Sequence, residues 1–580
     1  MAIRIFFILT LSGAATLFAQ TTRPNIVFIM TDDHARRAVS AYDTALIRTP
    51  NIDRIGREGI VFHNAFVTNS ICGPSRAVLL TGKYSHINGF RDNRSRFDGS
   101  QQTFPKILHA EGYYTAMIGK WHLVSEPVGF DYWNVLIDQG EYYNPDMIEM
   151  GDTIRREGYA TTIITDLAIE TLEKRKPQGQ PFCIFVHQKA PHRNWMPDTT
   201  HFDLFNDRDV PMPSSFYDDY EGRSRAAREQ DMRVEDMWLG YDLKLFLNEE
   251  SDETGTGGKK TTDRPLRIEP SLQRLNVAQR KSWDGYYRPI SEAFYREKPE
   301  GTALSKWKYQ RYIKDYLRCI ASVDDNVGRL LEYLEQKGLL DNTIIVYTSD
   351  QGFFLGEHGW YDKRFMYEPS LAIPLLMRFP PKIPAGTVSD AIALNLDFAP
   401  TLLQVAGVAP PADMQGKSLI PLFRNGKAKG WRKSMYYHYY EYPYGWHYVK
   451  KHYGVRTGRY KLIHFYNDND EWELYDLKRD AGEMHNLYGQ PKYDKTVKKL
   501  RKELARLQER LGKFEEQYLI SSAEFYRQFR TGEMGDEADF FEWSAFYQMW
   551  LSTREQLDVL KLSVAIYRYQ TEDISLAKAA

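Results

Sequence analysis

Cysteine is scarce in this chain of 580 residues, where only Cys72, Cys183 and Cys319 occur. Three cysteines allow at most one disulfide, which Cys183 and Cys319 could form, and two separate buried thiols are the expected alternative. Neither sign of charge dominates, because 76 Lys and Arg residues offset 77 Asp and Glu residues and leave a formal net charge of −1. That balance gives no electrostatic reason to expect a nucleic-acid partner. An anionic ligand would have to be bound by local cations instead.

Long apolar runs are also lacking, since no segment reaches the roughly 18 consecutive apolar residues of a membrane-spanning helix. At the N-terminus, the basic start Met1–Arg4 precedes the apolar run Ile5–Leu11 and a small-residue stretch that ends at Ala19. This order predicts a secretory signal peptide over residues 1–19, with cleavage after Ala15 as an alternative that suits the preference for small residues better. We therefore expect an exported protein, periplasmic or secreted, without a membrane span.

Four apolar segments share one pattern, a short β-branched run that ends abruptly in polar residues. They are Ile26–Met30 before Asp32 and Asp33, Thr115–Ile118 before Lys120 and His122, Phe182–Val186 before His187 and His192, and Thr343–Tyr347 before Asp350 and Gln351. Such runs are typical of strands buried on both faces of a parallel sheet, and helical patterns such as Ile313–Leu334 lie between them. Because ligands bind beyond the carboxyl ends of such strands, we expect the polar clusters to converge on one face.

The length predicts two or three domains. We expect an α/β domain over residues 24–425 with an insertion at about 202–305, within which the polar stretch 249–262 reads as an exposed loop. Residues 426–520 predict a smaller antiparallel subdomain: Tyr453–Tyr466 alternates, turns at Asn467–Asp470 and continues as Trp472–Leu477. An amphipathic helix expected to pack on this sheet carries apolar residues at Val497, Leu500, Leu504, Leu507, Leu511 and Phe514. The extension 521–580 predicts no function.

The stretch from Cys72 to Gly82 reads C-G-P-S-R-A-V-L-L-T-G. Pro74 fixes its own φ and interrupts the preceding strand-like run, while Arg76 lies one helical turn beyond Cys72 and can reach back toward it. Alone, the cysteine could be a small residue at the start of a buried helix. The complete pattern C-x-P-S-R-x-x-x-L-T-G, however, is the signature of the type I sulfatases. Over roughly residues 24–490 the chain resembles this family of the alkaline phosphatase superfamily.

The resemblance implies an alkaline-phosphatase-like fold, a large mixed and mostly parallel sheet sandwiched by helices, with a small C-terminal antiparallel sheet and its packed helix. It implies hydrolysis of sulfate esters by way of formylglycine, an aldehyde into which a maturation enzyme converts Cys72. The later sequence D-Q-G-F-F-L-G-E-H-G-W-Y-D-K-R-F-M-Y-E looks most like bacterial N-acetylglucosamine-6-sulfatases. The expected substrate is therefore an O-sulfated sugar or glycan, with 6-O-sulfated N-acetylglucosamine as first choice.

Asp32, Asp33, Asp350 and Gln351 offer only oxygen ligands. Oxygen ligands favour a hard cation such as Ca²⁺ and argue against Zn²⁺, which prefers His or Cys. An Asp pair alone could cap a helix, but a second polar pair after another buried strand favours metal binding. Type I sulfatases carry both pairs, and the resemblance implies one Ca²⁺ ion whose site is completed by position 72.

The resemblance also implies roles for a set of cations and bases around the sulfate. The metal and Arg76 would polarise the hydrate at position 72, Asp350 would help to deprotonate it, and its oxygen would attack sulfur to give an enzyme–sulfate ester. His192 and Lys363 would assist the leaving alcohol, and His122 would take the proton that expels sulfate. Lys120 would bind a sulfate oxygen and orient position 72.

Asp362 and Arg364 flank Lys363 and are expected to contact sugar hydroxyls. Neighbouring residues of an extended segment point to opposite sides, so Lys363 would point away from the face that Asp362 and Arg364 share. All three reach the substrate only if the segment is an irregular loop, which Gly356 and Gly359 favour. His438, His447 and His452 are weaker candidates, since such residues more often serve packing. The alternatives are another polysaccharide or aryl sulfatase, a phosphonate or phosphodiester hydrolase of the same superfamily, and a non-catalytic glycan-binding relative.

Overall fold

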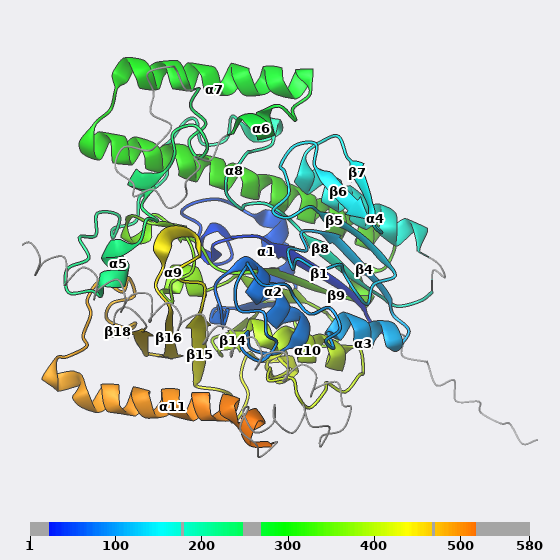
Figure 1. The fold of residues 1–580 in the computed structure, drawn as a ribbon. Coiled ribbons are helices and arrows are strands. Elements are labelled where there is room, and N and C mark those ends of the chain that lie inside the picture. Colours follow the sequence, from blue (N-terminus) through cyan, green and yellow to red (C-terminus); the bar gives the residue numbers. More distant parts are fainter. Residues whose placement is uncertain (1–22, 176–178, 247–267, 467–469, 518–580) are drawn as a thin grey trace, which may run out of the picture. The chain divides into compact units, whose positions relative to one another are not determined.

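The computed structural model of the chain, drawn in Figure 1, describes residues 23–175, 179–246, 268–466 and 470–517. The chain divides into two compact units, residues 1–501 and 502–580, and only residues 502–517 of the second unit are described. The predicted signal peptide, the predicted loop 249–262 and the extension 521–580 lie outside the described residues. Within the described ranges, no helix is long and apolar enough to cross a membrane.

The first unit is built on a ten-stranded sheet in the order β13-β2-β12-β9-β1-β8-β4-β5-β6-β7. Its five central strands, from β9 to β5, run parallel, whereas β12, β6 and β7 pair antiparallel with their neighbours. The prediction of a mixed, mostly parallel sheet is therefore confirmed. The strands are β1 (Asn25–Thr31), β2 (Ile60–Phe62), β4 (Tyr114–Gly119), β5 (Tyr132–Leu136), β6 (Asp146–Glu149), β7 (Asp152–Arg155), β8 (Phe182–His187), β9 (Thr343–Ser349), β12 (Leu375–Arg378) and β13 (Thr387–Ser389).

The central strands are apolar on both faces because each face is covered by helices. On β1, Val27 and Ile29 belong to one apolar core, whereas Ile26, Phe28 and Met30 belong to the other. Successive side chains of a strand point to opposite faces, so an unbroken apolar run supplies both cores at once. Helices α1 (Pro50–Arg57), α4 (Ala160–Lys174) and α8 (Gly301–Gln336) cover the first face, and α2 (Cys72–Thr81), α3 (Phe104–Ala110) and α10 (Phe398–Val405) cover the second.

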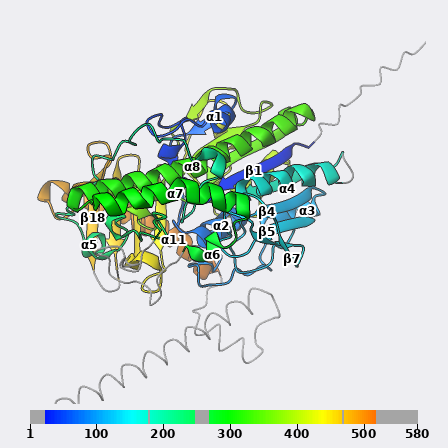
Figure 2. The same ribbon diagram turned by 90° about the horizontal axis from the view of Figure 1, so that it is seen from above.

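The helix predicted at Ile313–Leu334 is confirmed and is longer than its apolar pattern, because α8 continues to Gly301 at one end and Gln336 at the other. The predicted insertion contains α5 (Arg225–Glu229), α6 (Glu269–Leu272) and α7 (Val277–Glu297). Figures 1 and 2 both place α7 alongside α8, and the rings of Phe294 and Trp307 pack between these helices with centroids 4.5 Å apart.

A four-stranded antiparallel sheet follows in the C-terminal part of the first unit, in the order β15 (Ser434–Tyr439), β16 (His452–Thr457), β17 (Tyr460–Phe465) and β18 (Glu471–Asp476). The predicted pairing is confirmed, since β17 pairs with β18, whereas residues 467–469 of the predicted turn lie outside the described residues. The alternating stretch that precedes it is two strands, because a turn closed by Thr457 Oγ1 and the backbone of Tyr460 separates β16 from β17. Helix α11 (Asp494–Gln517) is also confirmed, and its Arg501 guanidinium lies 4.3 Å from the ring of Trp472 in β18.

Short elements complete the described residues. The two-residue strands β3 (Ala65–Phe66) and β14 (Ala393–Leu394) pair in parallel, and β10 (Phe354–Leu355) pairs antiparallel with β11 (Tyr361–Asp362). Helix α9 (Glu368–Leu371) follows β11. The segment from β10 to α9 thus returns the chain past the end of β9 and presents Asp362, Lys363 and Arg364 there.

Candidate active site

Four oxygen-bearing side chains meet where β1 and β9 end. These strands pair in parallel with Thr31 opposite Ser349, so the residues that follow them emerge at the same level of the sheet. The Asp33 amide donates to Asp350 Oδ1 over 3.2 Å, and Gln351 Nε2 donates to Asp33 Oδ1. Asp32, Asp33, Asp350 and Gln351 are all buried. The predicted ligand set therefore converges in one buried cluster.

The chemistry of this cluster fits a divalent cation. Asp32 Oδ1 and Gln351 Oε1 are buried, and neither has a hydrogen-bond partner among the described residues. Burial, together with the charge of Asp32, raises the pKa of Asp350, and burial raises the pKa of Asp33 to about 6. Carboxylates are costly to bury at such close range unless a cation compensates them. Orphaned oxygens and mutually repelling carboxyl groups are the pattern that a hard, oxygen-seeking ion would relieve.

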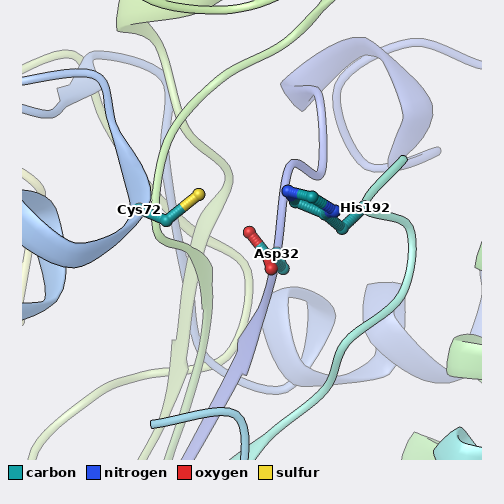
Figure 3. A group of neighbouring side chains, drawn as sticks. All are labelled: Asp32, Cys72 and His192. Atoms are coloured by element: carbon teal, nitrogen blue, oxygen red, sulfur yellow. The ribbon is translucent and has the colours of Figure 1, made fainter. Parts of the chain in front are cut away.

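Cys72 opens α2 beside this cluster and is 1% exposed. Its Sγ accepts a hydrogen bond from Gln351 Nε2 over 3.5 Å, and burial raises the pKa of the thiol. Figure 3 shows Cys72, Asp32 and His192 facing one space, and one potential ligand atom from each lies within 4.8 Å of the others. Cys183 and Cys319 are also free and buried, as predicted.

Arg76 joins the signature helix to the acidic cluster from one turn further along α2. Its Nε and NH2 donate to Asp350 Oδ2 over 3.0 and 2.8 Å, and its NH1 donates to the carbonyl of Lys120 over 2.6 Å. The pair is fully buried, and burial opposes but does not outweigh the attraction of Asp350, which raises the pKa of Arg76. A permanent cation therefore stands between Cys72 and the ends of β4 and β9.

Lys120 and His122 follow β4. Lys120 Nζ pairs with Asp32 Oδ2 and donates to Gln139 Oε1 over 2.6 Å, and Gln139 Nε2 donates to His122 Nε2 over 2.9 Å. Burial and the charge of Lys120 lower the pKa of His122 to about 4, so its imidazole is neutral and can accept a proton. No sequence motif marks Gln139, which lies in the loop after β5 and was not predicted.

His192 and Lys363 approach the cluster at Asp33. Lys363 Nζ lies 2.6 Å from Asp33 Oδ2, and His192 Nε2 lies 3.7 Å from the same oxygen. Burial lowers the pKa of His192, whereas Asp33 overcomes the effect of burial and raises the pKa of Lys363. In the free protein Lys363 is therefore the charged member of this pair. His192 Nδ1 donates to the carbonyl of Arg193 over 2.7 Å, which fixes the ring.

Asp362 and Arg364 lie on one side of an irregular segment, as the sequence required. Both have positive φ, 76° and 88°, and Asp362 Oδ1 pairs with Arg364 NH1. Asp362 Oδ2 lies 2.8 Å from Nε2 of His447, which comes from the C-terminal part of the chain. Asp362, Arg364 and His447 are buried, so they form a compact polar group beside Lys363.

Two further residues complete this polar group and carry no recognisable sequence signal. Glu441 Oε2 lies 3.9 Å from Arg364 Nε, and Asp231 Oδ1 lies 3.2 Å from His447 Nδ1. Of the weaker histidine candidates, only His447 reaches the site. His438 bonds to two tyrosine hydroxyls, and His452 accepts from the amide of Met366 and stacks on Phe365, so both serve packing.

Two family models match the chain. The model described as Sulfatase matches residues 24–408, and the model described as N-sulphoglucosamine sulphohydrolase, C-terminal, matches residues 356–510. The chain is 54% identical over 487 residues to an N-acetylglucosamine-6-O-sulfatase of Bacteroides thetaiotaomicron, covering 83% of this chain and 85% of the relative. It is 28% identical over 463 residues to the human N-acetylglucosamine-6-sulfatase, covering 74% of this chain and 70% of the relative.

A solved structure supports the same assignment. That protein, in complex with its substrate D-glucosamine-2-N,6-O-disulfate, superposes with a TM-score of 0.79 at 53% sequence identity, over 84% of this chain and 98% of the other. The family model covers more than half of the chain, and the bacterial relative aligns over most of its length. The resemblance inferred from Cys72–Gly82 is thereby confirmed: the chain belongs to the sulfatase family of sulfuric ester hydrolases.

Proposed function

We propose that this sulfatase removes the 6-O-sulfate of a glucosamine residue, N-acetylated or N-sulfated, in a sulfated glycan or a sugar derived from one. The observation that carries the proposal is the polar group of Asp362, Arg364 and His447 beside Lys363. A sulfate pocket alone would serve any sulfate ester, whereas this group offers buried hydrogen-bonding partners to the sugar that bears the sulfate. The names of the two aligned 6-sulfatases and the substrate of the superposed structure support the same choice.

The acidic cluster supports a single Ca²⁺ ion held by Asp32, Asp33, Asp350 and Gln351, with position 72 completing the site. Conversion of Cys72 to formylglycine by a maturation enzyme belongs to the proposal, as does export of the chain. The ion would supply positive charge to sulfate oxygens, and the hydrated aldehyde at position 72 would supply the attacking oxygen.

The chain's own residues position the sulfate and move protons. Lys120 and Lys363 hold cationic groups on either side of the cluster, where negative charge develops on the sulfuryl oxygens. Asp350 lies against Arg76 in the signature helix, so it is placed to accept a proton from the nucleophile. His122 is neutral and accepts a second proton, which allows sulfate to leave. Lys363, which shares Asp33 Oδ2 with His192, is charged and stabilises the departing alkoxide.

Sulfate release from a panel of substrates tests the proposal. Enzyme whose Cys72 modification has been verified by mass spectrometry is assayed on glucosamine 6-sulfates, on sugars sulfated at other positions, on an aryl sulfate and on a phosphodiester. We expect the highest kcat/KM on the glucosamine 6-sulfates and no turnover by the Cys72→Ala variant. Preference for another sulfated position would refute the substrate assignment, and preference for the phosphodiester would refute the reaction assignment.

A further inference from the structure

Exposed aromatic side chains gather in one short stretch of the C-terminal part of the first unit. Tyr444, Trp446 and Tyr448 are 73%, 40% and 44% exposed and lie within five consecutive residues. Single exposed apolar residues are ordinary, but several together mark a surface that binds something. These three residues are called the aromatic rim below.

The loop that carries the rim is held in the candidate active site at two points. Before the rim, the buried Glu441 lies 3.9 Å from Arg364 Nε. Within it, His447 has a φ of 68° and turns inward to reach Asp362 Oδ2 over 2.8 Å. The ring of Trp446 lies 6.4 Å from the ring of His447, centroid to centroid. The rim is therefore the solvent-facing continuation of the polar group proposed to bind the sulfated sugar.

A second segment, which carries Asn93 and Arg94, contacts the signature helix, Glu441 and the rim. Asn93 Oδ1 accepts from the amide of Gly73, next to Cys72, over 3.0 Å, and the amide of Asn93 donates to Glu441 Oε1 over 3.2 Å. The following residue, Arg94, is exposed and places its guanidinium 4.4 Å from the centroid of the Tyr444 ring. Asn93 thus links the residue next to Cys72 to Glu441, and the exposed Arg94 beside it contacts Tyr444 of the rim.

We propose that the aromatic rim and Arg94 form a subsite for the sugar residue linked to the sulfated one, and that the subsite favours a neighbour bearing a carboxylate or sulfate group. The inference rests on the proposed function, because it places the sulfated residue against Asp362 and Arg364. An aromatic side chain presents a large flat apolar surface with few rotatable bonds, which suits the C–H face of a sugar ring. A guanidinium forms charge-assisted hydrogen bonds with oxyanions. A sulfated monosaccharide is too short to occupy this subsite.

Paired substrates separate the subsite from the active site itself. One substrate is 6-O-sulfated N-acetylglucosamine as a monosaccharide, and the other is the same residue joined to a uronic acid. We expect Trp446→Ala to lower kcat/KM on the disaccharide about five- to tenfold and to change it less than twofold on the monosaccharide. Trp446→Phe should restore most of the loss, because it returns a flat ring. Tyr333→Ala serves as the matched control, since this partly exposed tyrosine of α8 contacts Lys337 instead.

A second comparison tests the charge preference. Arg94→Gln should reduce the preference for a uronic acid over a neutral neighbour about fivefold, and raised salt should mimic the substitution in the wild-type enzyme. Equal losses on mono- and disaccharide, or no loss on either, would overturn the proposal. So would a dimer in sedimentation that Trp446→Ala dissociates without altering the substrate ratio, since the rim would then bind a second copy. If the wild-type enzyme prefers another sulfated position, the proposed function is refuted. The subsite is then tested by the ratio of kcat/KM on the disaccharide and the monosaccharide that carry sulfate at that position.

Discussion

Arg364 gives the sharpest test of sugar recognition, because one of its buried donors has no partner among the described residues. Both oxygens of Asp362 are already used, Oδ1 by Arg364 and by the amide of Lys363, and Oδ2 by His447. Arg364 Nε, by contrast, is buried without a hydrogen-bond partner among the described residues. We therefore expect Arg364 to contact the substrate and Asp362 to hold Arg364 and His447 in place.

The Arg364→Ala substitution removes a buried, charge-assisted donor. A hydrogen bond of this kind contributes about 1.5–3 kcal/mol, which corresponds to roughly a ten- to 150-fold fall in kcat/KM on the sugar sulfate. An aryl sulfate has no group in that position and should lose less than twofold. Asp362→Ala should be worse for stability, because it leaves the guanidinium buried with only Glu441 at 3.9 Å to compensate it. Breaking a buried pair costs about 3–5 kcal/mol, and Glu441 should reduce this figure.

The assay compares kcat/KM on 6-O-sulfated N-acetylglucosamine and on a chromogenic aryl sulfate, with thermal unfolding measured for each variant. Arg364→Lys is the matched control, since it keeps the charge but not the planar fork of donors. Equal losses on both substrates would show that Arg364 supports the sulfate pocket itself. No loss on either would refute the reasoning and leave the specificity of the enzyme without a structural basis in this group.

Three further outcomes are expected. Cys72→Ala should abolish turnover and leave the unfolding temperature unchanged, whereas unmodified cysteine found by mass spectrometry in fully active enzyme would contradict the formylglycine mechanism. Metal analysis of active enzyme should find one Ca²⁺ per chain, lost together with activity in Asp32→Ala; two zinc ions would contradict the oxygen-ligand argument. Burial opposes protonation of His447, but Asp362 outweighs it and raises the pKa of His447 above the usual 6.5. The stability that protonated His447 contributes is therefore complete below about pH 6.5 and is lost as the pH rises through the folded-state pKa. Asp362→Asn should therefore move the alkaline fall in unfolding temperature to lower pH, and an unmoved profile would show that another group titrates.

The sequence predicted the centre of the fold better than its edges, for a physical reason. Strands such as β1 and β9 are buried on both faces, so their composition alone identifies them. Strand β7, with the sequence Asp152-Thr-Ile-Arg155, lies at the edge of the sheet, and all four of its residues are exposed. It has no apolar pattern to detect. The break between β16 and β17 was missed because a four-residue turn hardly disturbs an alternating pattern.

The sequence likewise predicted some residues of the site and not others. Residues that follow buried strands, such as Asp32 and Lys120, could be expected to converge because strand order places them together. Gln139, Glu441 and Asp231 could not, since each comes from a loop whose path depends on tertiary packing. The positive φ values at Asp362 and Arg364 were likewise not predicted, because arginine rarely adopts this conformation and aspartate adopts it only at a minority of positions.

The burial of Cys72 has a consequence for how active enzyme is made. Every residue of α2 is buried, and a Cβ added at the neighbouring Gly73 would lie 2.6 Å from the Phe90 ring and 3.1 Å from the carbonyl of His122. A second protein cannot handle this thiol without displacing the signature helix from the core. The proposed conversion of Cys72 would therefore have to precede folding, and a chain that folded first would remain stable but inactive. The specific activity of a preparation would then depend on the fraction of chains converted before they folded. Later purification or metal loading would not change that fraction.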